Sequence, residues 1–362
     1  MDISKIDKNF AVGEFHDDGD TRYYNIPCAP FDLYGVYYEK ETDRFVRMPS
    51  AVADKVSEGV SGLNAHTTGG RIRFSTDSRK ISITVTYEWL SEMSNMPLMG
   101  SSSFVLVAEI ENGFEHVSTF YPRNSVYDET AKKGYSATGY LYGEMKNYIL
   151  FFPLYNDVKS LKIGLDKDAV VTHGTKYRED IKPILYYGSS ITQGGCASRP
   201  DNDYQAIISK RNNIDFINLG FSGNAKAEPA ICEYLSTVDC SVFVCDYDHN
   251  APDAEFLSKT HYPLYRTYRE KRPDTPIIFV SKPNTEHDNE LNVRFNIIKE
   301  TYEKALAAGD KNVYLVDGRT FFAGRERDAC TVDGCHPNDL GFFKMADVIG
   351  AKIEEILHKN RT

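Results

Sequence analysis

Two loops of this 362-residue chain carry residue types that together perform nucleophilic catalysis. Ser190 follows the apolar run 183–187 and Gly188, in a turn that would expose its hydroxyl. Asp333 and His336 lie three residues apart, so the carboxylate can orient the imidazole, which can then take the serine proton. Taken singly, the loops also fit a plain Gly-Ser turn and a surface carboxylate beside a capping histidine. Together they predict an acyl-transfer site that needs no cofactor.

Two further loops carry groups that could stabilise a developing negative charge. The loop 218–225 contains Gly223, whose backbone N–H could face an oxyanion. The loop 246–251 contains Asn250, whose side-chain amide could donate to the same oxyanion. Asparagine in such a loop is more often a turn or helix-capping residue. A role in catalysis therefore requires the fold to bring both loops to Ser190.

The second half of the chain alternates short apolar runs with helical patterns. This alternation predicts a parallel sheet of about five strands with helices on both faces. Ligands of such sheets bind at the carboxyl ends of the strands, where these loops would meet. The expected strands are 183–187, 216–219, 241–245, 277–280 and 313–316, and the expected helices are 204–210, 291–308 and a last one bearing Phe342, Ala346, Ile349, Ile353 and Ile356.

Strand and turn patterns dominate the chain up to about residue 172. In 80–89, Ile81, Ile83 and Val85 alternate with polar residues, which is typical of a strand with one buried face. Several such strands predict a β-sandwich. Further strands are expected around Ile72 and Phe74, at 104–110 and at 148–152, with one helix at 51–63. A polar stretch at 173–182 suggests two domains, 1–177 and 178–362.

The order Ser, Gly, Asn, Asp-x-x-His at strand ends resembles the SGNH hydrolase superfamily, the GDSL type of esterase. By that resemblance Ser190 is the nucleophile, and Asp333 and His336 complete a catalytic triad. The oxyanion hole would comprise Ser190 itself, Gly223 and Asn250. The resemblance implies a three-layer, flavodoxin-like catalytic domain with a parallel sheet.

The chain is also similar to a two-domain subgroup of that superfamily, with a jelly-roll-like β-sandwich in front. Residues 188–196 read Gly-Ser-Ser-Ile-Thr-Gln-Gly-Gly-Cys, a usual form of the subgroup's nucleophile block. Ser189 replaces the aspartate of the commonest motif, so something else must orient this loop. The subgroup's Gly-x-Asp-Leu-Tyr motif is missing at 103–107, where we expect it, and Asp32–Leu33–Tyr34 matches it only superficially.

Composition and charge restrict the partners. A formal charge of -10 argues against nucleic acid and anionic membranes, which would repel the protein. No apolar run is long enough to span a membrane, and the N-terminus has no secretory pattern, so a cytoplasmic location is expected. Seven cysteines without C-x-x-C spacing favour reduced thiols. Asp246 and Asp248 lack metal-ligand spacing, and neither a metal nor a cofactor is expected.

The expected activity is hydrolysis of small acyl esters, acetyl above all, on carbohydrates, because the resemblance implies that substrate class. One alternative is an O-acyltransferase that uses the same site with an acceptor hydroxyl in place of water. Another is a carbohydrate-binding protein without activity, which the complete set of site residues argues against. The substrate would be a small molecule or an oligosaccharide ester, and a homo-oligomer is left open.

Overall fold

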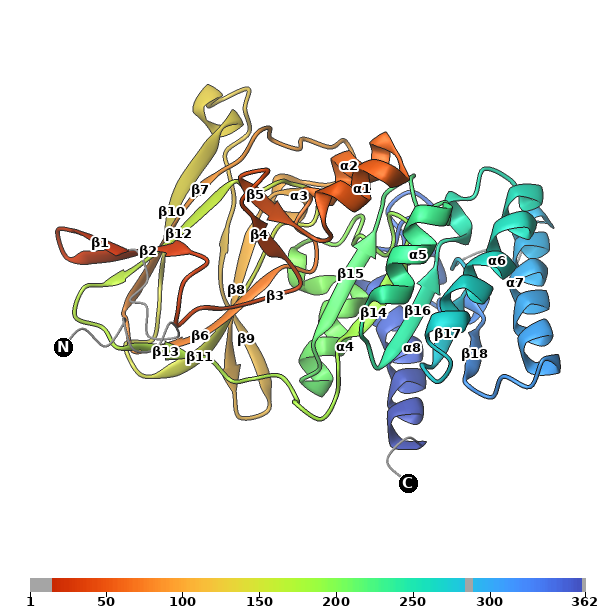
Figure 1. Ribbon diagram of the computed structural model, residues 1–362. Coiled ribbons are helices and arrows are strands. Elements are labelled where there is room, and N and C mark those ends of the chain that lie inside the picture. The colour runs from red at the N-terminus through yellow and green to blue at the C-terminus, as the bar shows by residue number, and fades with distance from the viewer. Residues whose placement is uncertain (1–14, 284–288, 360–362) are drawn as a thin grey trace. The chain divides into compact units, whose positions relative to one another are not determined.

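The computed structural model describes residues 15–283 and 289–359, which form two compact units (Figure 1). The first unit holds 15–47, 65–177 and 199–201, and the second holds 48–64, 178–198 and 202–359. This division differs from the predicted domains, 1–177 and 178–362, mainly at 48–64. The physical reason is burial, because Met48, Ala53 and Val60 lie in the hydrophobic core of the second unit.

The first unit is a β-sandwich of two antiparallel sheets. One sheet has the strand order β1-β2-β12-β7-β10, and the other has β13-β6-β11-β8-β9 with β3 paired to β6. One core takes its side chains from both sheets. The strands are β1 (Phe15–Asp18), β2 (Thr21–Ile26), β3 (Asp32–Tyr34), β6 (Arg71–Thr76), β7 (Lys80–Thr86), β8 (Phe104–Ile110), β9 (Gly113–Phe120), β10 (Gly134–Tyr140), β11 (Lys146–Phe151), β12 (Ser160–Asp166) and β13 (Val171–His173), with a separate hairpin of β4 (Tyr37–Glu39) and β5 (Arg44–Val46) and a short helix α3 (Leu98–Ser101).

The predicted alternation in β7 is confirmed. Ile81, Ile83 and Val85 are at most 1% exposed, whereas the polar residues between them are half-buried. The sequence predicts one helix at 51–63, and the structure has two, α1 (Ser50–Val56) and α2 (Glu58–Asn64), which break at Ser57. Ser57 has extended backbone angles, and its hydroxyl accepts the N–H of Val60 (3.2 Å), so it begins the second helix.

The second unit contains a five-stranded parallel sheet in the order β15-β14-β16-β17-β18. The first strand of the sheet in the chain lies second in space, which is the flavodoxin-like order. Its elements are β14 (Ile184–Gly188), α4 (Tyr204–Asn212), β15 (Phe216–Gly220), α5 (Pro229–Thr237), β16 (Val242–Asp246), α6 (Ala254–Lys271), β17 (Ile277–Val280), α7 (Asn289–Ala307), β18 (Val313–Val316) and α8 (Asp339–Lys359). The predicted three-layer α/β domain is confirmed.

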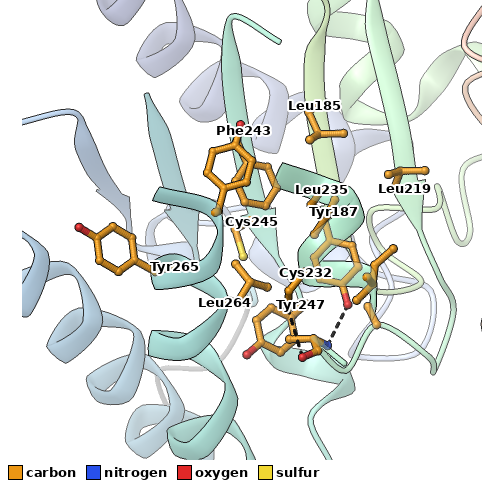
Figure 2. Packing of buried hydrophobic residues seen from close by; sticks show 14 of the residues in the cluster. Leu185, Tyr187, Leu219, Cys232, Leu235, Phe243, Cys245, Tyr247, Leu264 and Tyr265 are labelled. Carbon is orange, nitrogen blue, oxygen red and sulfur yellow. Dashed lines mark hydrogen bonds between the residues drawn. The ribbon is translucent and has the colours of Figure 1, made fainter. Parts of the chain in front are cut away.

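Helices cover both faces of this sheet. On one face α5 and α6 pack over β14 and β16, and Figure 2 shows Leu235 and Leu264 of these helices beside Tyr187 and Cys245 of the strands. The Tyr187 hydroxyl accepts the N–H of Ala227 (2.9 Å), so even the polar end of this buried ring has a partner.

The opposite face is covered by α4 and α8. Tyr186 of β14 meets Tyr204 of α4 edge-on, with ring centroids 5.5 Å apart, and Tyr204 stacks on Phe342 of α8. The whole predicted stripe of the last helix is buried, including Ile349 and Ile353. No helix in the described ranges is both long and apolar enough to cross a membrane.

Candidate active site

Ser190 lies just beyond the carboxyl end of β14, which lies between β15 and β16 in the sheet. The turn is tight, since a side chain at Gly188 would collide with the backbone carbonyl of Asp246 on the neighbouring strand. The Ser190 carbonyl accepts the N–H of Gly195 (2.8 Å), which closes the turn. Ser190 is only 6% exposed. Its hydroxyl is thus held in a fixed place at the sheet edge.

A chain of hydrogen bonds joins Ser190, His336 and Asp333, the three residues that the sequence predicts to act together. Ser190 Oγ lies 2.9 Å from His336 Nε2, and His336 Nδ1 lies 2.8 Å from Asp333 Oδ2. The second carboxylate oxygen of Asp333 accepts the backbone N–H groups of Cys335 (3.0 Å) and His336 (2.7 Å). The carboxylate therefore fixes both the loop and the imidazole that the loop carries.

The loop that carries Asp333 and His336 is short and closed on itself. The N–H of Val332 donates to the His336 carbonyl (3.0 Å), and Thr331 and Pro337 form a bridge. Gly334 adopts a left-handed φ of 80° at the tip, which few other residues adopt without strain. Asp333 and His336 lie in one loop, and the backbone contacts that close this loop fix the position of the two side chains relative to each other.

Gly223 and Asn250 lie on the loops that follow the two strands flanking β14. The Oδ1 of Asn250 accepts the N–H of Ala225 (3.2 Å), which ties the two loops together. Gly223 has a left-handed φ of 71° and open space where a side chain would stand. Among the residues that the structure describes, neither the Gly223 N–H nor the Asn250 Nδ2 has a hydrogen-bond partner. Both donors are thus available to a bound group.

The turn that carries Asn250 is anchored from behind by a buried arginine. Arg294 of α7 is 5% exposed and donates to the carbonyls of Asp248 (2.7 Å) and Ala251 (2.8 Å). The Asp248 carboxylate accepts the backbone N–H of Lys282 (3.2 Å), at the end of the adjacent strand. A donor on so fixed a turn needs little rearrangement when charge develops nearby.

The buried side chain of Asp246 takes over part of the orienting role that Ser189 leaves open. Its Oδ2 lies 3.2 Å from the Thr192 hydroxyl, and its backbone carbonyl accepts the N–H of Ser189 (3.2 Å). Burial raises the pKa of Asp246 well above its usual range and so favours the neutral carboxyl. The sequence pattern raised Asp246 only as a possible metal ligand, because its burial at the end of β16 is not visible in the motif.

Cys335, between the two triad candidates, pairs with His249. Its Sγ lies 3.1 Å from His249 Nε2, and it also interacts with the His336 ring. Burial alone would raise the pKa of the Cys335 thiol, but the hydrogen bonds with His249 and His336 outweigh burial and lower it to about 5. No motif in the sequence indicates this pair, since 86 residues separate its members.

The same contacts set the charge of His336. Its interaction with Cys335, aided by the Asp333 carboxylate, outweighs burial and raises the pKa of His336 to about 9. For Asp333, burial would raise the pKa, but the hydrogen bonds from His336 and Cys335 lower it to about 2. Near neutral pH the site therefore holds a thiolate and a carboxylate around a protonated imidazole.

A metal ion could find ligand atoms in this loop. One carboxylate oxygen of Asp333, Cys335 Sγ and a ring nitrogen of His336 all lie within 4.8 Å of one another. The same His336 ring already bonds to Ser190 and Asp333, so a metal would have to displace that arrangement. The donor set fits a thiophilic cation, but the hydrogen-bonded chain needs none.

Two family models match the two parts of this chain. A model of the GDSL-like lipase/acylhydrolase family matches residues 181–354, and a model of the N-terminus of SGNH-hydrolase-type esterases matches residues 21–171. No curated protein matches the chain.

Several solved structures are similar to nearly the whole chain. A GDSL-like lipase candidate from Bacteroides ovatus is 28% identical, with a TM-score of 0.82 over 93% of this chain and 98% of that one. The salicylyl-acyltransferase SsfX3 of a tetracycline biosynthetic pathway is 15% identical, with a TM-score of 0.74 over 92% and 96%. The acetyl xylan esterase Est2A from Butyrivibrio proteoclasticus is 12% identical, with a TM-score of 0.57 over 94% and 99%.

The model that matches the front domain covers residues 103–107, where the Gly-x-Asp-Leu-Tyr motif is missing, as well as Asp32–Leu33–Tyr34. Asp32 accepts a hydrogen bond from His173 Nδ1 (2.8 Å), which joins β3 to β13, two strands that both pair with β6. On the two matched models and the two-domain fold, the chain belongs to the SGNH/GDSL hydrolase superfamily, in the subgroup with an N-terminal β-domain.

Proposed function

We propose that this protein is a serine esterase that releases small acyl groups, acetyl first among them, from carbohydrate esters. The observation that carries the proposal is the continuous chain from Ser190 Oγ through His336 to Asp333, with steps of 2.9 Å and 2.8 Å. Membership of a hydrolase superfamily supports the reaction class. The fold alone would not, because one fold hosts many activities.

The reaction proceeds through an acyl-enzyme. Neutral His336 takes the proton of Ser190 as its oxygen attacks the ester carbonyl, and Asp333 stabilises the imidazolium that forms. His336 then protonates the leaving alcohol. A water molecule repeats the sequence from the other side and frees the acid. No step requires a metal or a cofactor.

The negative charge of the tetrahedral intermediate falls on the carbonyl oxygen. The Gly223 N–H and Asn250 Nδ2, with the backbone N–H of Ser190, form the proposed oxyanion hole. Because Asn250 Oδ1 is held by Ala225, its Nδ2 has a fixed direction before substrate arrives. Donors fixed in this way stabilise the transition state more than the ground state.

Carbohydrate as the alcohol part rests on relatives. Among proteins of the same fold are an acetyl xylan esterase and a family two carbohydrate esterase from Clostridium thermocellum that was crystallised with cellohexaose. These are at most 15% identical to this chain and share its fold, so the substrate class is the part of the proposal that most needs an assay.

The decisive experiment combines active-site labelling with a substrate panel. A fluorophosphonate probe should label Ser190, and acetate should be released from acetylated oligosaccharides by wild type but not by Ser190→Ala. Ser189→Ala is the matched control, because its hydroxyl is one residue away and accepts a hydrogen bond within the local turn. Labelling of another serine, or equal acetate release by Ser190→Ala, would refute the assignment. Sugar binding without labelling or turnover would instead indicate a binding protein.

The salicylyl-acyltransferase of similar fold supports a second candidate, transfer of the acyl group to an acceptor hydroxyl. Both reactions share the acyl-enzyme and differ only in what attacks it. Mass spectrometry of products formed with and without candidate acceptor sugars separates them. An acylated acceptor in place of free acid would favour the transferase.

A further inference from the structure

The seven cysteines of the chain all lie in its described part and none forms a disulfide there, yet they differ sharply in environment. Cys196, Cys232, Cys240, Cys245 and Cys330 are buried, and only Cys28 and Cys335 are partly exposed. Burial raises the pKa of Cys28 to about 11, which leaves it protonated. A thiol reacts with electrophiles as its thiolate, so accessibility and ionisation must coincide. They coincide at Cys335.

The surroundings of Cys335 favour the charged sulfur by geometry. His249 Nε2 lies 3.1 Å from Sγ, and the ring of His336 is the other partner. Two further charged groups act on this sulfur: Lys282 favours the thiolate, and the Asp333 carboxylate, which has an oxygen within 4.8 Å of Sγ, opposes it. Two imidazoles on one sulfur make a nucleophilic site that the proposed esterase mechanism does not use.

Oxidation of Cys335 would affect the catalytic loop because of where the sulfur lies. Cys335 joins the loop that carries His336 to the turn that carries His249 and Asn250. A sulfenic acid at Cys335 is larger than the thiolate and lacks its charge, so the 3.1 Å contact with His249 Nε2 should weaken. We expect the loop to shift, and His336 with it. Displacement of a catalytic group by about 1 Å costs on the order of a hundredfold in rate.

We propose that Cys335 is an oxidation site that switches the esterase off, through reaction of its thiolate with hydrogen peroxide. The sulfur attacks one peroxide oxygen, the O–O bond breaks and an S–O bond forms, which gives a sulfenic acid and hydroxide. The sulfur is oxidised by two electrons and the peroxide is reduced. A dithiol reduces the sulfenic acid: Cys335 returns to the thiol, water leaves, and the dithiol is oxidised to its disulfide.

The switch part of this inference rests on the proposed function, whereas the reactive thiol does not. The test therefore has two readouts on the full-length protein in EDTA: initial rates on p-nitrophenyl acetate, and identification of the oxidised cysteine by peptide mass spectrometry. Both are taken at pH 9, where about half of His336 is already neutral and loss of the Cys335 charge can raise the rate by no more than about twofold. With a small excess of peroxide, wild type should lose more than about 90% of its activity and recover it with dithiothreitol. The modified peptide should contain Cys335.

Cys335→Ser should keep its own starting activity under the same treatment, and Cys28→Ser, the matched control at the other partly exposed thiol, should be inactivated like wild type. His249→Gln should slow oxidation of Cys335 several-fold. This variant and the wild-type peptide map decide the matter even if Cys335→Ser does not fold. Oxidation at another cysteine, or equal inactivation of wild type and Cys335→Ser, would overturn the proposal. Oxidation at Cys335 in a protein that hydrolyses no ester would refute the proposed function and still support a reactive thiol at this position.

Discussion

Replacement of Cys335 by serine should move the acid limb of the pH–rate profile to lower pH. The general base must be neutral to accept the proton of Ser190, so kcat/KM rises as pH passes the pKa of His336 in the free enzyme. The interaction with Cys335 is the largest cause of the raised pKa of His336, about 9 against an ordinary 6.5. A hydroxyl at position 335 does not ionise and removes that cause, which leaves burial, which lowers the pKa of His336, and Asp333, which raises it.

The size of the effect follows from these values. With a pKa of about 9, roughly one His336 in a hundred is neutral at pH 7. Each unit by which the pKa falls raises that fraction about tenfold at a pH below both values. We expect the midpoint of the acid limb to fall by at least about one unit, and the relative loss of kcat/KM between pH 9 and pH 7 to shrink by at least about fivefold.

The assay is kcat/KM for p-nitrophenyl acetate from pH 5 to 10, corrected for spontaneous hydrolysis, with Cys28→Ser as the control for a thiol-to-hydroxyl change elsewhere. Because the midpoint is read from the shape of the profile, a uniform loss of rate in Cys335→Ser does not disturb it. A wild-type midpoint near 6.5, or midpoints for wild type and Cys335→Ser within about 0.3 units, would refute the coupling between Cys335 and His336.

Three further substitutions test the site. Ser190→Ala should lower kcat by about 10⁴-fold or more with an unchanged thermal midpoint, as in other serine triads, and near-normal turnover would contradict its role. Asn250→Ala should lower kcat by about 10²- to 10³-fold with little change in KM, whereas a loss confined to KM would make it a substrate-binding residue. Asp246→Asn should fold and keep activity, because burial favours the neutral form of the native carboxyl, whose shape the amide shares. The raised pKa of Asp246 means that wild type loses stability as pH rises above the unfolded value, so the advantage of the asparagine variant in thermal unfolding should grow from pH 4 to pH 8. A disadvantage that grows with pH would show that Asp246 is charged.

The sequence predicted those features that local pattern encodes. Apolar runs located the strands of the parallel sheet to within a residue or two, since buried strands need continuous apolar side chains. The order of the loops predicted which residues would meet, because the carboxyl ends of parallel strands share one edge. Ser190, His336 and Asp333 are accordingly within hydrogen-bonding distance in the structure.

Pairings across long stretches of sequence could not be predicted in the same way. The contact of Cys335 with His249 depends on how two irregular loops approach each other, and neither loop has a periodicity that reveals its partner. The raised pKa of Asp246 depends on its burial, which a polar residue type argues against. Residues 48–64 belong to the second unit because their apolar side chains are buried in its core. The helical pattern in the sequence shows that these side chains are buried, but not in which of the two cores.

The assignment of 48–64 to the second unit has a consequence for how the protein is made. The helices α1 and α2 leave the ribosome well before the sheet on which they pack, since β14 begins only at Ile184. Met48 and Val60, each at most 1% exposed in the finished structure, must stay solvated or be shielded until then. Domains usually fold in the order of their synthesis. Here, however, residues 48–64 of the second unit are synthesised before most of the first unit. A cut at residue 178 would therefore separate the hydrolase domain from part of its own core, and no single break in the chain yields both units whole.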